Sequence, residues 1–394
     1  MHRLLPLLAI LLPQMCLPVC AQLGRYCADF KMTRADFVDT VAIEWSRGQV
    51  YVPIIVDGQA CRFLLDTGAG MSVVYEGTPL AQGSPVGNII SHDATGRTDT
   101  VTMVALPPLQ LGSVGLYGCC ATVQQRPVGT PAVDGILGFD LVNGGLSMKI
   151  DVSNGRLVVT DRNGLFDRER PAVITKYSLD FHVPYIRITP FGRCRERVLF
   201  DTGSPLLFCI NKAAFDKVYT PSLTDCQVEG ISIGRHAIGH GGTEPEGEVA
   251  FLQLDALRLG KYRFADVHCV TTQGGSHLGA SLLAYGAVAF NPRKRTMMFF
   301  PTSDEQPCIV ANKQLDIAFV EDSLGRAQVG LLWEQGISYR QGFRQGDIIE
   351  EIDHRPVRGF THFVGWGFEK GREYVFTVFS SQGGRRDIKW VRRP

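Results

Sequence analysis

The sequence has no excess of charge of either sign. Among its 394 residues Lys and Arg number 40 and Asp and Glu number 39, which leaves a formal net charge of +1. This balance gives no support for a nucleic acid or an anionic membrane as partner, because these partners select basic surfaces. Basic residues do gather near the end, and we expect them to form a solvated face: Arg385, Arg386, Lys389, Arg392 and Arg393.

Apolar runs long enough to span a bilayer are also missing. Leu4–Leu12 is apolar but short, His2-Arg3 precedes it, and Val19-Cys20-Ala21 offers a small-residue cleavage site. Residues 1–21 therefore resemble a secretory signal peptide, and we expect cleavage after Ala21 and a secreted or periplasmic protein. Acylation of Cys20, as in a lipoprotein, is the alternative, which Val19 disfavours because a smaller residue is usual there.

The CxxC spacing of redox sites is absent, although the chain has 11 cysteines. Without Cys16 and Cys20, nine remain, and an odd number leaves at least one free thiol even in an oxidising compartment. The adjacent Cys119-Cys120 are poorly placed to pair with each other. Cys209 and Cys269 lie in apolar, strand-like runs and are predicted to be buried thiols.

Two common hydrolase motifs are missing as well. No serine stands in a Gly-x-Ser-x-Gly elbow. His236 and His240 have the spacing of a metal-binding helix, but the glycines around His240 argue against a helix, and no Glu follows His236 as metallopeptidases require. For Cys269, core packing is favoured over a thiol nucleophile beside a histidine. The sequence thus predicts neither a metal nor an organic cofactor.

What the chain does contain is one short pattern, present twice. Phe63–Ala69 reads Phe-Leu-Leu-Asp-Thr-Gly-Ala and Val198–Ser204 reads Val-Leu-Phe-Asp-Thr-Gly-Ser. Each copy is an apolar run, typical of a buried strand, that delivers an acid into a Thr-Gly turn. Because a buried, unpaired carboxylate is costly, Asp66 and Asp201 predict a site shared between the two halves.

Other landmarks repeat in the same order around these motifs. They are Val52-Pro53 and Val183-Pro184, Leu109–Gly112 and Leu257–Gly260, and Leu137-Gly138 and Leu278-Gly279. A repeat at this spacing predicts two duplicated β lobes rather than a solenoid.

The length allows two or three domains with full cores. We expect a signal peptide at 1–21, a lead-in at 22–45, a first lobe at 46–160, a linker at 161–171, a second lobe at 172–301 and a third unit at 308–394. The lead-in is either an added strand or a propeptide. Asp57-Gly58 predicts a hairpin turn. Ser91–Arg97 and Gly239–Glu244 are predicted to cover a cleft between the lobes, with ordinary surface hairpins as the alternative.

The paired Asp-Thr-Gly motifs, each followed downstream by Leu-Gly, resemble those of aspartic peptidases over residues 46–300. Ala69 after the first motif is similar to the retropepsin-like branch. The resemblance implies an all-β fold of two acid-peptidase-type lobes. It also implies a catalytic dyad of Asp66 and Asp201, in which two close carboxylates share one proton and activate water.

The same resemblance assigns supporting roles to the neighbours of the dyad. Thr67 and Thr202 are implied to hydrogen-bond across the interface, and Gly68 and Gly203 allow the backbone to approach closely. Ile136–Gly138 and His277–Gly279 are implied to pack behind the two loops. A hydroxyl donor at Ser204 is expected to favour charge on Asp201, which leaves Asp66 as the proton carrier. No Tyr lies between Tyr75 and Tyr117, so the flap tyrosine of pepsin-like enzymes has no counterpart.

The segment Gly342–Ile349 resembles the helix-to-strand turn of bacterial PDZ domains. Residues 308–394 are therefore predicted to form a PDZ-like, β-rich α+β domain. The resemblance implies capture of a C-terminal peptide along Leu315–Phe319, opposite Thr361–Phe368, with a carboxylate loop at Asn312–Leu315. The usual Gly-Leu-Gly-Phe pattern is absent there, and a structural or regulatory appendage is the alternative.

The sequence as a whole predicts an aspartic endopeptidase that hydrolyses extended polypeptide segments, with no integral membrane segment after signal cleavage. The alternative is a catalytically inactive peptide-binding protein of the same fold. Because both Asp-Thr-Gly motifs are intact and loss of one Asp is the simplest route to inactivity, the enzyme is favoured.

Overall fold

The computed structural model describes residues 26–93, 98–126, 133–220, 225–239, 242–369, 371–380 and 383–391. Strands dominate, which confirms the predicted all-β class. The helices of the described residues are short: α1 (Asp140–Asn143), α2 (Lys212–Val218), α3 (Ile337–Gln341) and α4 (Phe360–Val364), with 3-10 turns at Pro79–Gln82, Val152–Asn154, Phe166–Glu169 and Ala280–Tyr285. Within the described part of the chain no helix has the length and apolar character to cross a membrane.

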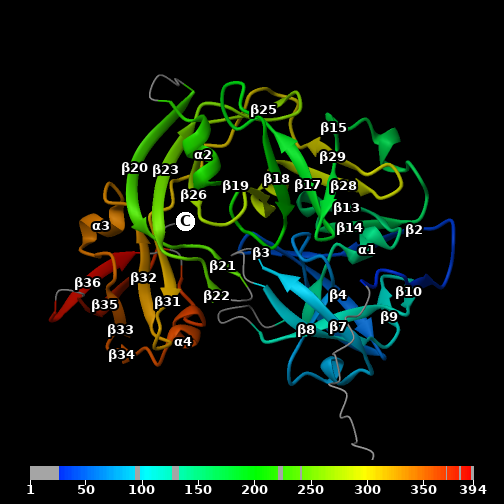
Figure 1. The fold of residues 1–394 in the computed structure, drawn as a ribbon, viewed down its shortest axis with the longest axis horizontal. Coiled ribbons are helices and arrows are strands. Elements are labelled where there is room, and N and C mark those ends of the chain that lie inside the picture. Colours follow the sequence, from blue (N-terminus) through cyan, green and yellow to red (C-terminus); the bar gives the residue numbers. More distant parts are fainter. Residues whose placement is uncertain are drawn as a thin grey trace, which may run out of the picture.

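The first repeat forms an 11-stranded sheet, blue to teal in Figure 1. In spatial order its strands are β1 (Lys31–Met32), β10 (Val114–Tyr117), β9 (Leu109–Leu111), β4 (Gln49–Val56), β5 (Gln59–Leu65), β12 (Gly135–Leu137), β6 (Val73–Tyr75), β11 (Cys120–Gln124), β8 (Thr98–Ala105) and β7 (Pro85–His92), and β3 (Glu44–Ser46) pairs with β4. The predicted turn at Asp57-Gly58 is confirmed, because both residues have positive φ and join β4 to β5.

The second repeat forms an eight-stranded sheet, mostly green and yellow in Figure 1. Its spatial order is β16 (Ser178–Asp180), β17 (Val183–Ile188), β18 (Glu196–Asp201), β27 (His277–Gly279), β19 (Phe208–Asn211), β26 (Val267–Thr272), β23 (Gly247–Leu254) and β20 (Cys226–Gly234). The path β4-β5-β12-β6-β11-β8-β7 of the first sheet thus recurs as β17-β18-β27-β19-β26-β23-β20.

One predicted correspondence between the repeats is wrong. Tyr51 pairs with Leu64, two residues before Asp66, whereas Tyr185 pairs with Leu199, two residues before Asp201. Tyr185 therefore matches Tyr51, and the two Val-Pro pairs are out of register with each other. Strand register is set by the turns and by which face of the strand is buried. The Val-Pro dipeptide that both repeats contain therefore did not determine the register.

A six-stranded sheet joins the two repeats. Its order is β15 (Val173–Lys176), β29 (Thr296–Pro301), β28 (Gly286–Asn291), β13 (Ser147–Asp151), β14 (Arg156–Thr160) and β2 (Val38–Ala42), so that β13 of the first repeat pairs with β28 of the second. β1 and β2 belong to the lead-in, which therefore supplies added strands. Smaller sheets contain β21 (Ile238–Gly239) with β22 (Gly242–Thr243), and β24 (Leu257–Leu259), β25 (Tyr262–Ala265) and β30 (Cys308–Ile309).

A single hydrophobic core runs through both repeats and the joining sheet. Phe290 of β28 belongs to this core, and its ring centroid lies 5.1 Å from that of Phe139 and 5.7 Å from that of Phe200. Phe139 follows β12, and Phe200 precedes Asp201. The packing thus fixes the ends of strands from both repeats against one shared element. The predicted buried thiols are also present, since Cys209 and Cys269 are both buried strand residues.

The C-terminal unit, orange to red in Figure 1, lies beside β20 and β23. Its sheet has the order β31 (Ile317–Glu321), β32 (Ala327–Leu332), β33 (Ile348–Ile352), β35 (Glu373–Phe379) and β36 (Arg385–Val391), and β34 (Arg355–Pro356) pairs with β33. This unit has a core of its own. A further cluster joins it to the second repeat, with Leu331 and Trp333 packing near Phe251, and Arg235 N donates to Gly330 O at 2.9 Å.

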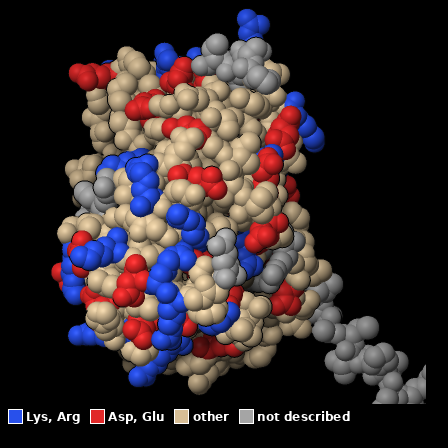
Figure 2. All heavy atoms as spheres, turned by 90° about the vertical axis from the view of Figure 1, so that its left-hand side faces the viewer, with Lys and Arg blue, Asp and Glu red and all other residues tan. Residues whose placement is uncertain are grey.

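The basic residues near the end of the chain are partly neutralised by local acids. Figure 2 shows Lys and Arg side chains over the C-terminal unit interspersed with Asp and Glu. Arg385 forms an ion pair with Glu350 at 2.6 Å, and Arg386 pairs with the buried Asp347. Arg392 and Arg393 lie outside the described residues. The described basic residues thus stabilise the unit's own sheet.

Candidate active site

Each Asp-Thr-Gly motif forms a turn at the end of a strand. Asp66 follows β5, and its Oδ1 accepts a hydrogen bond from Gly68 N at 2.7 Å. Asp201 ends β18, and its Oδ1 accepts from Gly203 N at 2.9 Å and from Ser204 N at 3.3 Å. The backbone of each turn therefore orients the carboxylate, because its N–H groups point at one oxygen.

The two turns meet face to face. A Cβ built on Gly68 would lie 2.6 Å from Asp201 Oδ1, and a Cβ built on Gly203 would lie 2.6 Å from Asp66 Oδ2. Both distances are below van der Waals contact, so only glycine fits at either position. The two carboxyl groups are themselves hydrogen-bonded to each other. The structure thus brings together the two acids predicted from the sequence.

Two threonines connect the turns across the interface. Thr67 Oγ1 donates to Phe200 O at 2.7 Å, and Thr202 Oγ1 donates to Leu65 O at 2.7 Å. Each hydroxyl also accepts from the other residue's backbone, with N···O distances of 3.0 and 3.1 Å. Because Thr67 and Thr202 are almost fully buried, water has little access to replace these hydrogen bonds.

A parallel strand packs behind each turn. β12 pairs with β5, and β27 pairs with β18. The loops are tied further by Phe139 N, which donates to Ala69 O, and by Ala280 N, which donates to Ser204 O, both at 2.8 Å. A Cβ on Gly279 would lie 2.1 Å from Leu206 O, so the close packing of this loop requires glycine.

The electrostatics of the pair favour one shared proton. Burial, the neighbouring Asp201 charge and the hydrogen bond that protonated Asp66 donates to Asp201 raise the pKa of Asp66 well above its usual 3.8. Burial also raises the pKa of Asp201, but the hydrogen bond with Asp66 and the N–H groups of Gly203 and Ser204 oppose that rise. Both carboxyl groups are thus harder to ionise than a free Asp, and the pair titrates as one coupled unit, in which the N–H donors of the second turn favour charge on Asp201.

The contribution of Ser204 differs from the predicted one. Its described contact with Asp201 comes from the backbone N–H, whereas the prediction relied on the hydroxyl. Alanine keeps that N–H. We therefore expect that replacement of Ser204 by Ala will leave the pH of the acidic limb of the pH–rate profile unchanged.

Two hairpins occupy equivalent places in the repeats. β7 and β8 form one, and His92 near its tip contacts Phe181 of the second repeat, with ring centroids 4.1 Å apart. β20 and β23 form the other, and their connection includes β21 and β22. Residues 94–97 and 240–241, which fall within the two predicted cleft-covering segments, lie outside the described residues.

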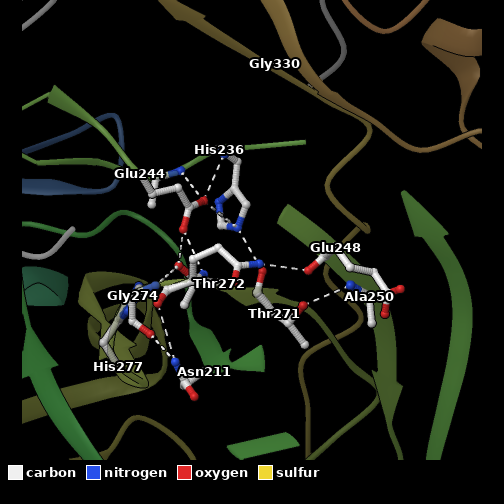
Figure 3. Close-up of polar contacts among 12 residues, drawn as sticks. Asn211, His236, Glu244, Glu248, Ala250, Thr271, Thr272, Gly274, His277 and Gly330 are labelled. Atoms are coloured by element: carbon white, nitrogen blue, oxygen red, sulfur yellow. Dashed lines mark hydrogen bonds and ion pairs between the residues drawn. The ribbon is translucent and has the colours of Figure 1, made fainter. Parts of the chain in front are cut away.

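A buried carboxylate, Glu244, lies in the connection between β20 and β23 (Figure 3). Glu244 Oε1 accepts from His236 N and Ala237 N at 3.0 and 2.9 Å, while Oε2 accepts from Thr272 Oγ1 and Gln273 N at 2.6 and 2.9 Å. Burial opposes ionisation, but the nearby His236 and these donors outweigh it and lower the pKa of Glu244. The carboxylate therefore ties the hairpin to the end of β26.

Replacement of Glu244 by Gln is expected to lower the free energy of unfolding by about 2 kcal/mol. The amide NH2 of Gln replaces one carboxylate oxygen, so the groups that donated to that oxygen lose their acceptor. Since the pKa of Glu244 is lowered, the difference from wild type should persist at mildly acid pH. It should disappear only as the pH falls through that lowered pKa. Urea unfolding across pH measures this, with the exposed Glu246→Gln as control. Equal stability of the two variants would contradict the role.

Both repeats share a contact that was not predicted from the sequence. The Arg62 guanidinium lies 3.7 Å from the Tyr51 ring centroid, and Arg197 lies 3.9 Å from that of Tyr185. Both arginines stand four residues before a motif Asp, a signal that the sequence contained. The contact follows from the strand register, in which Arg62 pairs with Pro53 and Arg197 pairs with Arg187. Each arginine is therefore the diagonal neighbour of a tyrosine two residues along the paired strand.

The predicted histidine pair is not on a helix. His236 precedes β21, and His240 lies outside the described residues. In the described ranges no group of three or more His, Cys, Asp or Glu side chains is arranged to hold a metal ion.

Comparison with known proteins finds a family match for the first repeat. No curated protein matches the chain. Residues 52–141, which include Asp66 and β12, match the family model described as aspartyl protease.

Proposed function

We propose that the protein is an aspartic-type endopeptidase that hydrolyses peptide bonds in extended polypeptide segments. The observation that carries the proposal is the pair of hydrogen-bonded carboxyl groups, Asp66 and Asp201, at the meeting of two similar turns. In this proposal the two repeats act as the lobes of a bilobal peptidase, and the substrate lies between them.

The proposed reaction uses water directly. Asp201, as the anion, accepts a proton from a water molecule while the water oxygen attacks the scissile carbonyl carbon. Asp66 donates its proton to the carbonyl oxygen, which gives a neutral tetrahedral intermediate. Collapse of the intermediate breaks the C–N bond. The amide nitrogen takes the proton from Asp201 and leaves as the amine, while one hydroxyl of the intermediate gives its proton to Asp66 as the carboxylic acid forms. The dyad thus returns to its singly protonated state.

A pH–rate profile tests the proposal. The singly protonated dyad is the active form, and the raised pKa of Asp66 keeps its proton in place above the usual 3.8. Activity should therefore extend above that pH and fall as the pH rises through the raised pKa, with the limbs reporting the coupled pair. The measurement is kcat/KM on an unfolded protein from about pH 3 to 8.

A statine-type inhibitor provides the matched control, because its tetrahedral hydroxyl mimics the hydrated carbonyl. It should block cleavage across the same range. Activity that is insensitive to this inhibitor, or that does not depend on pH, would contradict the proposal. A wild-type protein that cleaves nothing would favour the peptide-binding alternative.

We also propose that residues 308–394 act as a PDZ-like unit that captures or guides polypeptide. β31 is an edge strand of the described sheet, which is where strand addition takes place. The predicted carboxylate loop, however, is engaged elsewhere. Asn312 Oδ1 accepts from His268 N at 2.8 Å, and Gln314 Nε2 donates to Glu229 Oε2 at 2.8 Å. These contacts favour guidance along β31 over capture of a terminal carboxylate.

Export to an oxidising compartment completes the proposal. It rests on the signal-peptide pattern of residues 1–21, which lie outside the described residues.

A further inference from the structure

The segment Tyr26–Met32, here called the N-terminal strap, lies against the first catalytic turn. Tyr26 OH donates to Gly70 O at 3.0 Å, just beyond the Asp66 turn. Asn143 Nδ2 donates to Tyr26 OH at 2.8 Å and to His182 O at 2.9 Å. The Tyr26 ring also stacks on the His182 ring, with centroids 3.5 Å apart. The strap therefore contacts both repeats.

The next residue of the strap brings two thiols together. Cys27 Sγ lies 3.0 Å from Cys120 Sγ, although 93 residues separate them in the sequence. Cys120 begins β11 and is buried, whereas Cys27 is partly exposed. The pair packs in a small cluster with Met71 after the catalytic turn and Met103 of β8. The cysteines thus lie between the strap, the turn and the first hairpin.

We propose that Cys27 and Cys120 form a disulfide that fastens the N-terminal strap beside the catalytic turn. The inference rests on the proposed export of the protein, but not on its peptidase activity. A bond of about 2 Å requires the two sulfurs to approach by only about 1 Å. The neighbouring Cys119 is buried and belongs to the main core, so it is not the partner.

The oxidant is a disulfide-bearing thiol oxidant, represented by oxidised glutathione. The partly exposed Cys27 attacks first as the thiolate, because burial raises the pKa of Cys120 to about 12. Attack forms a mixed disulfide and releases one glutathione thiolate. Cys120 then loses its proton and attacks the mixed disulfide at Cys27 Sγ, which forms the Sγ–Sγ bond and releases the second glutathione. The two cysteine protons end on the two released thiols, so atoms and electrons balance.

The cross-link closes a loop that contains Asp66. Long loops gain the most from such closure, since more conformations of the unfolded chain are removed. The bond also holds Tyr26 on Gly70 O and His182, and so restrains the turn relative to the second repeat. We therefore expect the oxidised protein to melt several degrees above the reduced one.

Peptide mapping of the full chain provides the direct test. After treatment with oxidised glutathione, alkylation of free thiols and proteolysis without reductant, we expect a peptide containing Cys27 linked to the one containing Cys120. The link should survive in Cys119→Ser and disappear in Cys120→Ser. Recovery of both cysteines in alkylated form, or a link that persists without Cys120, would overturn the proposal.

Thermal unfolding supplies the second readout. Reductant should lower the Tm of wild type and leave that of Cys27→Ser unchanged. Cys61→Ser removes another partly exposed cysteine of the same sheet and should retain the reductant effect. An equal effect of reductant on Cys27→Ser and wild type would contradict the cross-link, whether or not the protein cleaves peptides.

Discussion

Replacement of Asp66 or Asp201 by Asn is expected to lower kcat by roughly 10⁴-fold. Asn has nearly the same shape as Asp but neither accepts the proton of water as a base nor donates an acid proton to the carbonyl oxygen. Because the two carboxyl groups act as one unit, the double variant should be little worse than either single variant. Steady-state cleavage of an unfolded protein measures the loss.

The Asn variants should remain folded, which separates loss of chemistry from loss of structure. Burial and mutual repulsion disfavour ionisation of the two acids, so replacement of one of them by the neutral Asn is expected to leave stability unchanged or increased. Asp57→Asn is the matched control, since Asp57 is an exposed turn residue of the neighbouring hairpin with a φ of 49° that Asn also adopts. Wild-type activity in both dyad variants would exclude the proposed mechanism.

Replacement of Thr202 by Val is expected to lower the free energy of unfolding by about 3 kcal/mol. Valine keeps the shape but removes the donor to Leu65 O and the acceptor for Thr67 N, so two buried groups lose their partner. We also expect kcat to fall about a hundredfold, because the two turns lose their fixed separation. Urea unfolding and steady-state kinetics measure the two effects.

Thr202→Ser is the matched control, since it keeps the hydroxyl and should approach wild type in both measurements. Thr67→Val should resemble Thr202→Val, because the bonding is reciprocal. The double variant should be less destabilised than the sum of the two, since they share hydrogen bonds. Strict additivity would show that the threonines act independently.

Local chemistry made several features predictable. Asp57-Gly58 forms the predicted hairpin turn because both residues adopt positive φ at little cost, which is a property of the residues themselves. The apolar runs likewise predicted buried strands, and the resemblance to aspartic peptidases implied the all-β fold. The meeting of Asp66 and Asp201 was inferred from the chemistry of a buried acid, which needs a partner wherever it lies in the sequence.

Other features were predicted wrongly or not at all, because they depend on strand register and long-range packing. The match of Tyr51 with Tyr185 follows from which residue each tyrosine pairs with on the neighbouring strand. The side chain of Gln314, in the segment expected to bind a peptide carboxylate, donates to Glu229 of the second repeat, and no local pattern predicted that contact. Ser204 acts through its backbone, which its side-chain identity did not reveal.

The amino-acid sequence alone therefore identified the two acids, the strand-turn segments that carry them and the repeat that relates the two segments. Folding in three dimensions decided which backbone N–H groups stabilise Asp201, which carboxylate ties the β20–β23 connection to β26 and which two of the cysteines meet. The reason is that secondary structure and turn chemistry depend on neighbours within a few residues. Desolvation, hydrogen bonding and thiol proximity depend on groups such as Cys27 and Cys120, which only the packed chain brings within contact.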